Sequence, residues 1–519
     1  MRPARRLLAL LIPGVVALSG GQPAVAQSGS SWAQYQQGPG RSGSLASAPA
    51  AAYRVAWHTA TGIGDSAHVA GLPAPAIDGD DAIVVGRQDV TAVAVGTGAV
   101  DWTVPRELGP SAPAAVAAGS ILFPEGGGDE SSSAATASPS ATTSFTPSSP
   151  SGASAIPSVA GSSAACRTPA PTSPGTPRLV ALDAATHSVR WRLDLPGVSR
   201  TGAVVDGGFV AIGTDGGTVV AVDPSTGKVR WTKDVGDCID VPLAAADGIV
   251  YVAARSVERA APQIVALRES DGTNAWAQPY VPRTSSTAIG APSVVGGTLY
   301  VALADATVRA VDAATGSERW ATRLNAFVGG APPVVVGDAV VVADTRGQVY
   351  RLDASSGSRI WDFAMNTSVI GAPAVAGSTI LVPTADGDLA AFDLDSGHQI
   401  WRASLGDGDA GLALALTADT IVLARTGSSP GLVGLVNDPN GSLTDIESPT
   451  VLKPALLLGG WALAAIPLVL LLLLAGRALS ARLGPVGPIG VTEDWDPDDP
   501  ALRGGANGED EEEDEDRDR

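Results

Sequence analysis

Residues 221–231 read Ala-Val-Asp-Pro-Ser-Thr-Gly-Lys-Val-Arg-Trp, and this segment dictates the architecture of the chain. Its apolar start is typical of the end of a β-strand, and Trp231 follows Gly227 by four residues in the next strand. Asp and Thr side chains bond nearby backbone groups in turns, and glycine accepts the positive φ that tight turns require. The segment therefore predicts a β-hairpin.

The same segment recurs along the chain. Residues 310–320 repeat it closely, and residues 351–361 and 391–401 repeat it with Ser in place of Thr. A tryptophan ends each copy, about 40 to 45 residues after the previous one except across one insertion; these residues are Trp57, Trp102, Trp191, Trp231, Trp276, Trp320, Trp361 and Trp401. Two further strand signals precede each copy. Four short strands per repeat predict one blade of a β-propeller.

The repeated segment resembles the blades of the pyrroloquinoline-quinone-like (PQQ-like) propeller family, which end in Ala-x-Asp-x-x-Thr-Gly-x-x-x-Trp. The resemblance covers residues 50–440 and implies that each Trp docks between neighbouring blades. Residues 27–49 resemble the lead-in that precedes the first blade in that family. Some copies depart from the pattern, and we expect less regular turns there; the departing residues are Ala94, His187, Arg268 and Asp271.

Incomplete sets of strands at the two ends of the repeat region predict how the ring closes. Tyr53–Thr59 forms a strand with no blade of its own, and three strand candidates without a Trp follow residue 401, at 411–417, 420–424 and 431–436. Pairing the N-terminal strand with this last set gives eight blades, an all-β eight-bladed propeller. Seven blades with a stray strand is the alternative.

Both ends of the chain carry apolar segments that predict membrane export and anchoring. Residues 1–26 combine an Arg-containing start, an apolar stretch and Ala24-Val25-Ala26, as in a cleaved signal peptide, although an uncleaved anchor is the alternative. After a linker at 441–453, residues 454–476 are free of charge and long enough to span a bilayer. Flanking arginines favour a cytoplasmic C-terminus. We therefore expect a single-pass protein of the cell membrane with an extracytoplasmic propeller.

Two segments lack the composition of a folded core. Residues 125–176 are rich in Ser, Thr, Ala, Pro and Gly, and are expected to form a disordered insertion in the second blade. The tail at 477–519 includes Glu509–Asp516, an unbroken acidic run, and is expected to be disordered in the cytoplasm, as a solubilising tail or as a docking tail for a basic partner. Cys166 and Cys238 could form a disulfide outside the cell or remain separate thiols.

Composition and spacing argue against several kinds of chemistry. A net charge of −20 excludes a nucleic-acid binder that relies on overall positive charge. Two cysteines and four scattered histidines give no metal-ligand spacing, and the Asp-Gly-Asp stretches at 386–388 and 407–409 read as turns rather than calcium loops. We therefore assign no catalytic, cofactor-binding or metal-binding residue.

The family resemblance raises one specific activity. Quinoprotein alcohol dehydrogenases of this fold hold PQQ and calcium with carboxylates in the central funnel and commonly carry adjacent cysteines. Cys166 and Cys238 are far apart in sequence, and no acid pair can be assigned to such a site. We expect a non-enzymatic scaffold that binds a protein or a cell-envelope component. The alternatives are a PQQ-binding quinoprotein, a transmembrane sensor and a carbohydrate-binding propeller. The scarcity of Lys beside abundant Arg favours an actinobacterial source.

Overall fold

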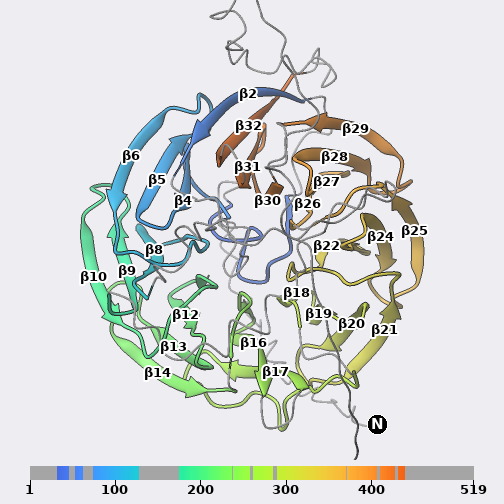
Figure 1. The fold of residues 1–519 in the computed structure, drawn as a ribbon. Coiled ribbons are helices and arrows are strands. Elements are labelled where there is room, and N and C mark those ends of the chain that lie inside the picture. The colour runs from blue at the N-terminus through green and yellow to red at the C-terminus, as the bar shows by residue number, and fades with distance from the viewer. Residues whose placement is uncertain are drawn as a thin grey trace, which may run out of the picture. The chain divides into compact units, whose positions relative to one another are not determined.

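The computed structural model describes the repeat region and the lead-in. The described residues are 32–45, 53–61, 74–127, 175–236, 238–256, 261–284, 289–369, 371–405, 410–426 and 430–438. The chain divides into two compact units, Met1–Ser448 and Pro449–Arg519, and every described residue belongs to the first. Within the described ranges this unit contains strands and no helix, and its strands form eight sheets arranged as a ring (Figure 1). The expectation of an all-β, eight-bladed propeller is confirmed.

The consecutive strands of each blade pair antiparallel, and the first of them lies toward the axis of the ring (Figure 1). Blade 1 contains β3 (Ala76–Asp78), β4 (Asp81–Val85), β5 (Asp89–Ala94) and β6 (Val100–Pro105). Blade 2 contains β7 (Ala115–Ala117), β8 (Ser120–Glu125), β9 (Arg178–Asp183) and β10 (Val189–Asp194). Blade 3 contains β11 (Ala203–Asp206), β12 (Phe209–Gly213), β13 (Thr218–Val222) and β14 (Val229–Asp234). Blade 4 contains β15 (Ala244–Ala246), β16 (Ile249–Ser256) and β17 (Ala261–Arg268).

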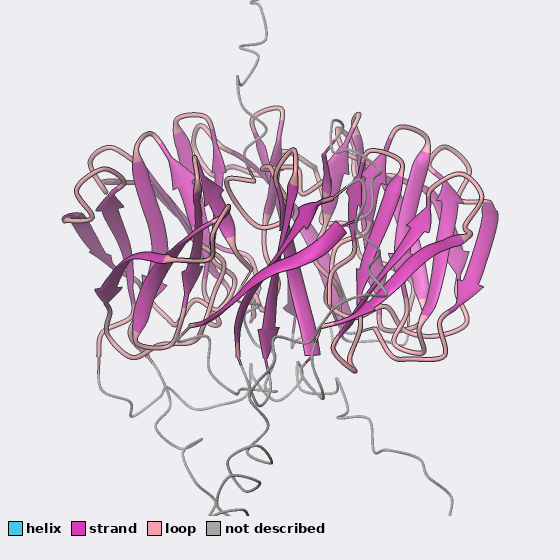
Figure 2. Ribbon diagram, turned by 90° about the horizontal axis from the view of Figure 1, so that it is seen from above, coloured by secondary structure: helices cyan, strands magenta, loops and turns pink. Residues whose placement is uncertain are grey.

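The second half of the ring repeats this order. Blade 5 contains β18 (Ser293–Val295), β19 (Thr298–Leu303), β20 (Thr307–Asp312) and β21 (Glu318–Arg323). Blade 6 contains β22 (Val334–Val336), β23 (Ala339–Ala343), β24 (Gln348–Asp353) and β25 (Arg359–Ala364). Blade 7 contains β26 (Ala374–Ala376), β27 (Thr379–Pro383), β28 (Asp388–Asp393) and β29 (Gln399–Ser404), with the short β1 (Ser44–Leu45) at its inner edge. Figure 2 shows the strands running between the two faces of the ring.

The N-terminal strand closes the ring. Blade 8 contains β30 (Ala410–Leu416), β31 (Thr420–Thr426) and β32 (Gly431–Asn437), and its outermost strand is β2 (Tyr53–Ala60) from the other end of the repeat region. Tyr53 lies opposite Asn437 and Ala60 opposite Gly431, with a register shift between Val55 and Trp57. Because this pairing joins the first and last segments, the ring has no open end at which another strand could add.

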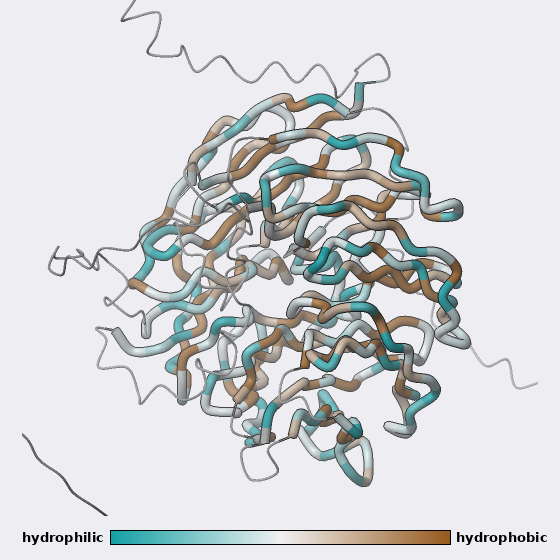
Figure 3. Tube along the Cα trace, turned by 45° about the vertical axis from the view of Figure 1, so that its right-hand side comes forward, coloured by the Kyte–Doolittle hydropathy of each residue, from teal (hydrophilic) through white to brown (hydrophobic). Residues whose placement is uncertain are grey.

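Burial follows the position of a strand within its blade. The inner and middle strands are mostly buried because both faces pack against neighbouring blades, and β23 is buried along its whole length. The outermost strands alternate; in β25 every second side chain is exposed. Figure 3 shows hydrophobic segments concentrated in the strands and hydrophilic ones in many turns.

The hairpin predicted at 221–231 has the expected turn chemistry. Asp223 Oδ1 accepts hydrogen bonds from the backbone and hydroxyl groups of Ser225 and Thr226, and Gly227 has a φ of +69°. Asp223 Oδ2 lies 3.0 Å from Arg230 Nη2. The Ser225 hydroxyl, followed by the Arg230 guanidinium, holds the pKa of the Asp223 carboxyl well below its usual range.

The copies that depart from the repeat keep the same turn. The expectation of less regular turns at these positions is wrong for the backbone, because Gly98 N still bonds Ala94 O at 2.8 Å and Gly272 N bonds Arg268 O at 2.9 Å. His187 replaces the glycine, adopts a φ of +56° and donates its N–H to Asp183 O at 2.8 Å. Pairing of the two flanking strands therefore determines the turn, and the Asp side chain reinforces it.

Blade 4 differs from the predicted four-stranded unit. After β17 the chain makes only two isolated bridges, Leu267 with Asn274 and Ile264 with Tyr280, in place of a fourth strand. Between them runs Ala-Trp-Ala-Gln-Pro, and Pro279 has no N–H to donate to a strand partner. The outer edge of blade 4 is therefore covered by an irregular segment that still carries Trp276.

Several sequence-based expectations lie outside the described residues. They concern the signal peptide at 1–26, most of the insertion at 125–176, the linker at 441–453, the span at 454–476 and the tail at 477–519. At the edges of the insertion, β8 ends at Glu125 and β9 begins at Arg178, so the insertion connects two strands of blade 2. Within the described ranges, no helix has the length and apolar character needed to cross a membrane.

Candidate functional site

Six tryptophans join consecutive blades through the same hydrogen bond. The indole N–H of each donates to a main-chain carbonyl oxygen in the turn of the next blade, at 2.8 to 3.0 Å. The acceptor is always the residue after the position that Asp223 occupies in the repeated segment. The donor and acceptor pairs are Trp57 with Val95, Trp191 with Pro224, Trp231 with Glu269, Trp276 with Ala313, Trp320 with Ala354, and Trp361 with Leu394. The repeated Trp therefore lies at the seam between blades.

The turn glycine of the next blade packs against the indole ring. A Cβ added to Gly227 would lie 2.6 Å from the Trp191 ring, and one added to Gly397 would lie 2.6 Å from the Trp361 ring. Glycine is required at this place for two reasons, the positive φ of the turn and the close approach of the indole. The repeat thus links the turn of one blade to the side chain of its neighbour.

Two tryptophans make different contacts. Trp102 stacks on His187, with ring centroids 4.3 Å apart and ring planes at 23°, and its Nε1 donates to Asp81 Oδ2 at 3.2 Å. His187 stands where the other blades with this turn have glycine, so here an imidazole, rather than a glycine, packs against the indole ring of the preceding blade. Trp401 faces blade 8, which lacks the repeated turn, and packs against Tyr53 with ring centroids 6.2 Å apart.

The lead-in lies in the centre of the ring (Figure 1). It contacts blades 1 to 7 in order, and in each blade the same inner-strand residue donates its N–H to the lead-in. The pairs are Ile77 with Trp32 O, Val116 with Ala33 O, Val205 with Gln34 Oε1, Ala245 with Pro39 O, Val294 with Gly40 O, Val335 with Ser42 O, and Val375 with Gly43 O. The unpaired inner edges of seven sheets are thereby satisfied within the molecule.

Side chains of the lead-in are buried at the axis. Trp32, Tyr35, Gln36 and Arg41 are at most 1 % exposed. The Gln34 amide both donates to Val205 O at 2.8 Å and accepts from Val205 N at 3.1 Å, replacing a strand partner. Sequence reasoning identified the lead-in by resemblance, but its place at the axis has no local signal, because contacts with seven blades are a product of the closed ring.

The described lead-in residues at the axis provide no acidic ligand for the PQQ–calcium group that the resemblance implies. The lead-in residues 32–45 include no Asp or Glu, and they contribute neutral groups and the Arg41 cation. In the described part of the chain, no group of three or more Asp, Glu, His or Cys residues is arranged to hold a metal ion. Because calcium takes several carboxylate and carbonyl oxygens, the described donor set does not fit that group.

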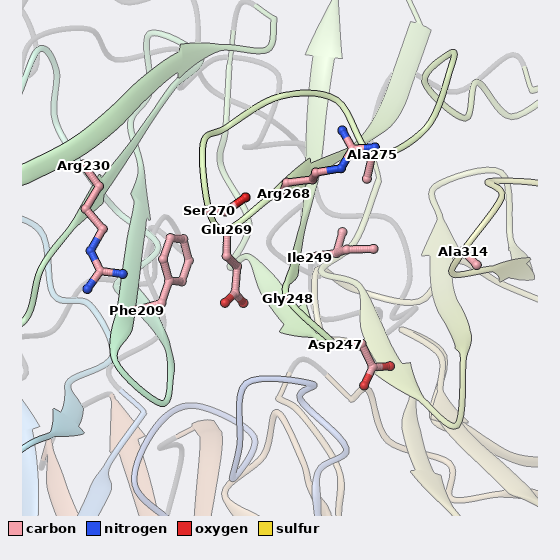
Figure 4. Close-up of a pocket in the computed structure, with 10 residues that line it drawn as sticks. All are labelled: Phe209, Arg230, Asp247, Gly248, Ile249, Arg268, Glu269, Ser270, Ala275 and Ala314. Atoms are coloured by element: carbon pink, nitrogen blue, oxygen red, sulfur yellow. The ribbon is translucent and has the colours of Figure 1, made fainter. Parts of the chain in front are cut away.

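A groove of about 660 Å³ opens across blades 3, 4 and 5 (Figure 4). Blade 4 supplies most of its lining, through its two turns and the start of β16, while Phe209 and Arg230 come from blade 3 and Ala314 from blade 5. In Figure 4, Phe209 and Arg230 lie on one side of Glu269, and Ile249 and Arg268 lie on the other. Apolar side chains and charges of both signs thus share one concave surface.

A pair of carboxyl groups crosses the seam beside this groove. Burial, reinforced by the nearby charge of Asp206, raises the pKa of Glu269 to about 7. Burial also raises the pKa of Asp206, which is hydrogen-bonded to Glu269. Arg230 lowers the pKa of Glu269 only partly, because its guanidinium is already paired with Asp223. Two partly buried carboxyl groups in contact therefore disfavour negative charge on both at once.

The sequence contained a signal for this pair, although it was interpreted only as an irregular turn. Arg268 and Glu269 stand where most other blades have Asp followed by an apolar residue or Pro, as in Asp312-Ala313. At position 269 a charged side chain therefore replaces the apolar residue or Pro of the other blades. The partner Asp206 comes from the previous blade, so the pairing itself required the structure.

The cysteines are only partly described. Cys238 is disulfide-bonded and 1 % exposed, between blades 3 and 4. Cys166, the other cysteine of the chain, lies outside the described residues, so its pairing with Cys238 stays a prediction.

Comparison with known families identifies the repeat. A family model described as outer membrane protein assembly factor BamB matches residues 175–327 and 304–446, which together span more than half of the chain. The chain belongs to this PQQ-like propeller family. The expected resemblance is thereby confirmed for the family.

Solved structures share the fold of this PQQ-like propeller. BamB from Moraxella catarrhalis is 19 % identical and superposes with a TM-score of 0.50, covering 71 % of this chain and 94 % of that one. A europium-containing methanol dehydrogenase is 14 % identical with a TM-score of 0.56, covering 78 % and 90 %. Quinohemoprotein alcohol dehydrogenase from Comamonas testosteroni is 12 % identical with a TM-score of 0.55, covering 80 % and 81 %. At these identities the likeness concerns the fold alone.

One curated relative matches part of the chain. The serine/threonine-protein kinase AfsK of Streptomyces griseus is 34 % identical over 130 residues, which are 24 % of this chain and 15 % of the kinase. The matched segment therefore spans about a seventh of that protein's length.

Proposed function

We propose that this protein is a non-enzymatic, membrane-anchored scaffold whose extracytoplasmic propeller binds a partner protein or a cell-envelope component. The observation that supports it best is the acid-free lead-in at the axis, which takes up the inner edges of seven blades. The surface left for recognition is the rim and the turns. Membership of the family described as BamB also favours a scaffold.

The groove across blades 3 to 5 is the surface that we propose for partner binding. Its lining is partly apolar, which drives association, and carries Arg268, Glu269 and Asp247 at its edge, which provide specificity. A photo-crosslinking residue placed at Ser270 in the groove should capture a defined partner in native membranes. The same residue placed at Thr103, on the outer strand of blade 1, should not.

A second variant makes this experiment decisive. Ala314→Arg introduces a bulky cation at the blade 5 side of the groove and should reduce the crosslink formed from Ser270. Equal capture from Ser270 and Thr103, or capture that Ala314→Arg leaves unchanged, would count against the groove as the binding surface. Mass spectrometry of the captured species names the partner.

A quinoprotein is the second candidate, because a methanol dehydrogenase and an alcohol dehydrogenase share the fold. The discriminating measurement adds PQQ and Ca²⁺ to the full-length protein and follows its absorbance and its Tm. A scaffold shows neither a new quinone band nor a higher Tm. A rise in Tm that needs both additions would replace the scaffold with a quinoprotein.

A further inference from the structure

Arg41 is a buried cation at the axis of the ring. It is 1 % exposed, and the backbone on both sides of it is held, since Val294 N donates to Gly40 O at 2.7 Å and Val335 N donates to Ser42 O at 2.9 Å. The guanidinium reaches toward blade 4, where Nε donates to Leu243 O, and its Nη1 donates to Tyr35 O at 2.9 Å. Its position is therefore fixed by the fold.

The guanidinium is not neutralised by any described group. A guanidinium carries five N–H donors, and Nη2 of Arg41 is buried with no acceptor among the described residues. Its two acceptors are main-chain carbonyls, and the described part of the chain gives it no carboxylate partner. The buried Arg106 makes the contrast, because Glu125 and Asp89 act on it electrostatically.

Arg41 nevertheless carries its charge at neutral pH. Burial lowers its pKa to about 10, which is still well above neutral pH. A buried charge without a counter-charge is strongly unfavourable, and carbonyl dipoles do not supply a negative charge. A second buried donor on the lead-in, Trp32 Nε1, also has no acceptor among the described residues. Two buried oxygen atoms of the lead-in, Tyr35 Oη and Gln36 Oε1, lack partners there as well, but neither carries a negative charge. The axis thus holds one positive charge without a counter-charge among the described residues.

We propose that a small inorganic anion, normally chloride, binds at the axis of the ring against Nη2 of Arg41. A single-atom ion is the smallest anion that supplies this charge, and close packing of the lead-in on both sides of Arg41 disfavours a larger one. A Cβ added to Gly40 would lie 2.4 Å from Val294 O, and one added to Gly43 would lie 2.9 Å from the Val334 side chain. The ion supplies the missing counter-charge and ties the lead-in to the ring. This inference is independent of the proposed scaffold function.

Bromide tests the site directly, because it replaces chloride and scatters anomalously. Crystals of the full-length protein grown or soaked in sodium bromide should show an anomalous peak within hydrogen-bonding distance of Arg41 Nη2. The absence of a peak there, in crystals with ordered bromide elsewhere or with none, would overturn the proposal. This measurement uses the unmodified protein and does not depend on a variant that folds.

Thermal unfolding provides the second test. The Tm of the full-length protein should rise with chloride or bromide at constant ionic strength when the balancing salt is sodium HEPES, whose anion is too large for a buried site. Arg41→Met removes the charge and should abolish this dependence. Arg323→Met, which removes an exposed cation of blade 5, should retain it. A Tm independent of chloride, equal dependence in both variants, or stabilisation by phosphate alone would overturn the proposal.

Discussion

The indole N–H of Trp231 donates to the main-chain carbonyl of Glu269 at 2.8 Å, and this bond joins blade 3 to blade 4. The side chain of the same glutamate is hydrogen-bonded to Asp206 across the same seam. One residue therefore makes a permanent backbone contact and a titratable side-chain contact between two blades. The other five Trp seams with this hydrogen bond have a hydrophobic residue or Pro at this place, so only the seam between blades 3 and 4 has a carboxyl group at this position.

Trp231→Ala should destabilise the ring strongly. The indole is 9 % exposed, and it packs against Gly272 and Phe209. Truncating a buried aromatic residue costs about 3–5 kcal/mol, and here the inter-blade hydrogen bond is lost as well. Trp231→Phe keeps most of the packing and should cost less. Calorimetry or denaturant unfolding measures both, and an unchanged melting curve for Trp231→Ala would contradict the docking role.

Gly227→Ala should cost more than Gly207→Ala. Both glycines have a positive φ, +69° and +54°, so both substitutions incur the conformational cost of about 1–2 kcal/mol. A Cβ at residue 227 also meets the Trp191 ring at 2.6 Å, whereas nothing lies within 4 Å of a Cβ at residue 207. The difference in the free energy of unfolding between the two variants therefore isolates the contact with the indole. Equal costs would show that the glycine serves the turn alone.

Glu269→Gln should remove part of the pH dependence of stability. The pKa of Glu269 in the folded protein, about 7, lies above its ordinary value of 4.5, so folding favours the protonated form. The stabilisation is fully present below about pH 4.5 and is lost as the pH rises through about 7. Gln resembles the protonated acid, so the Tm advantage of Glu269→Gln over the natural protein should grow from acidic to alkaline pH.

Asp206→Asn is the matched variant for the acid pair. It removes the neighbouring negative charge and leaves burial in place, so the loss of stability with rising pH should become shallower but persist. A Tm difference between Glu269→Gln and the natural protein that stays constant with pH would show that folding does not raise the pKa of Glu269.

Gln34→Ala should loosen the lead-in from blade 3. The Gln34 amide satisfies both Val205 N and Val205 O, which are buried at the inner edge of β11. A buried backbone group left without a partner costs about 1–3 kcal/mol. Gln37→Ala is the control, because that side chain only accepts one hydrogen bond from Ser42 at 2.8 Å. Hydrogen exchange at Val205 should accelerate in the first variant and remain slow in the second.

Repetition made most of the fold accessible without coordinates. One hairpin with a Trp at a constant place predicted the blades, and the unmatched strand at Tyr53–Thr59 predicted how the ring closes. The irregular outer edge of blade 4 was missed, because the spacing of Trp276 follows the repeat while Pro279 interrupts the strand. The retained turn at His187 was also missed, because strand pairing imposes it on a residue that does not favour it.

The amino-acid sequence alone determined the blade, the number of blades and the closing strand, because each depends on a local pattern of apolar residues, turn residues and tryptophan that recurs along the chain. Only the tertiary structure placed Arg41 and Trp32 at the axis and brought Asp206 to Glu269. Those relationships join residues from different blades or from the centre of the ring. These contacts form only once the ring has closed, so they cannot be recognised from a local sequence pattern.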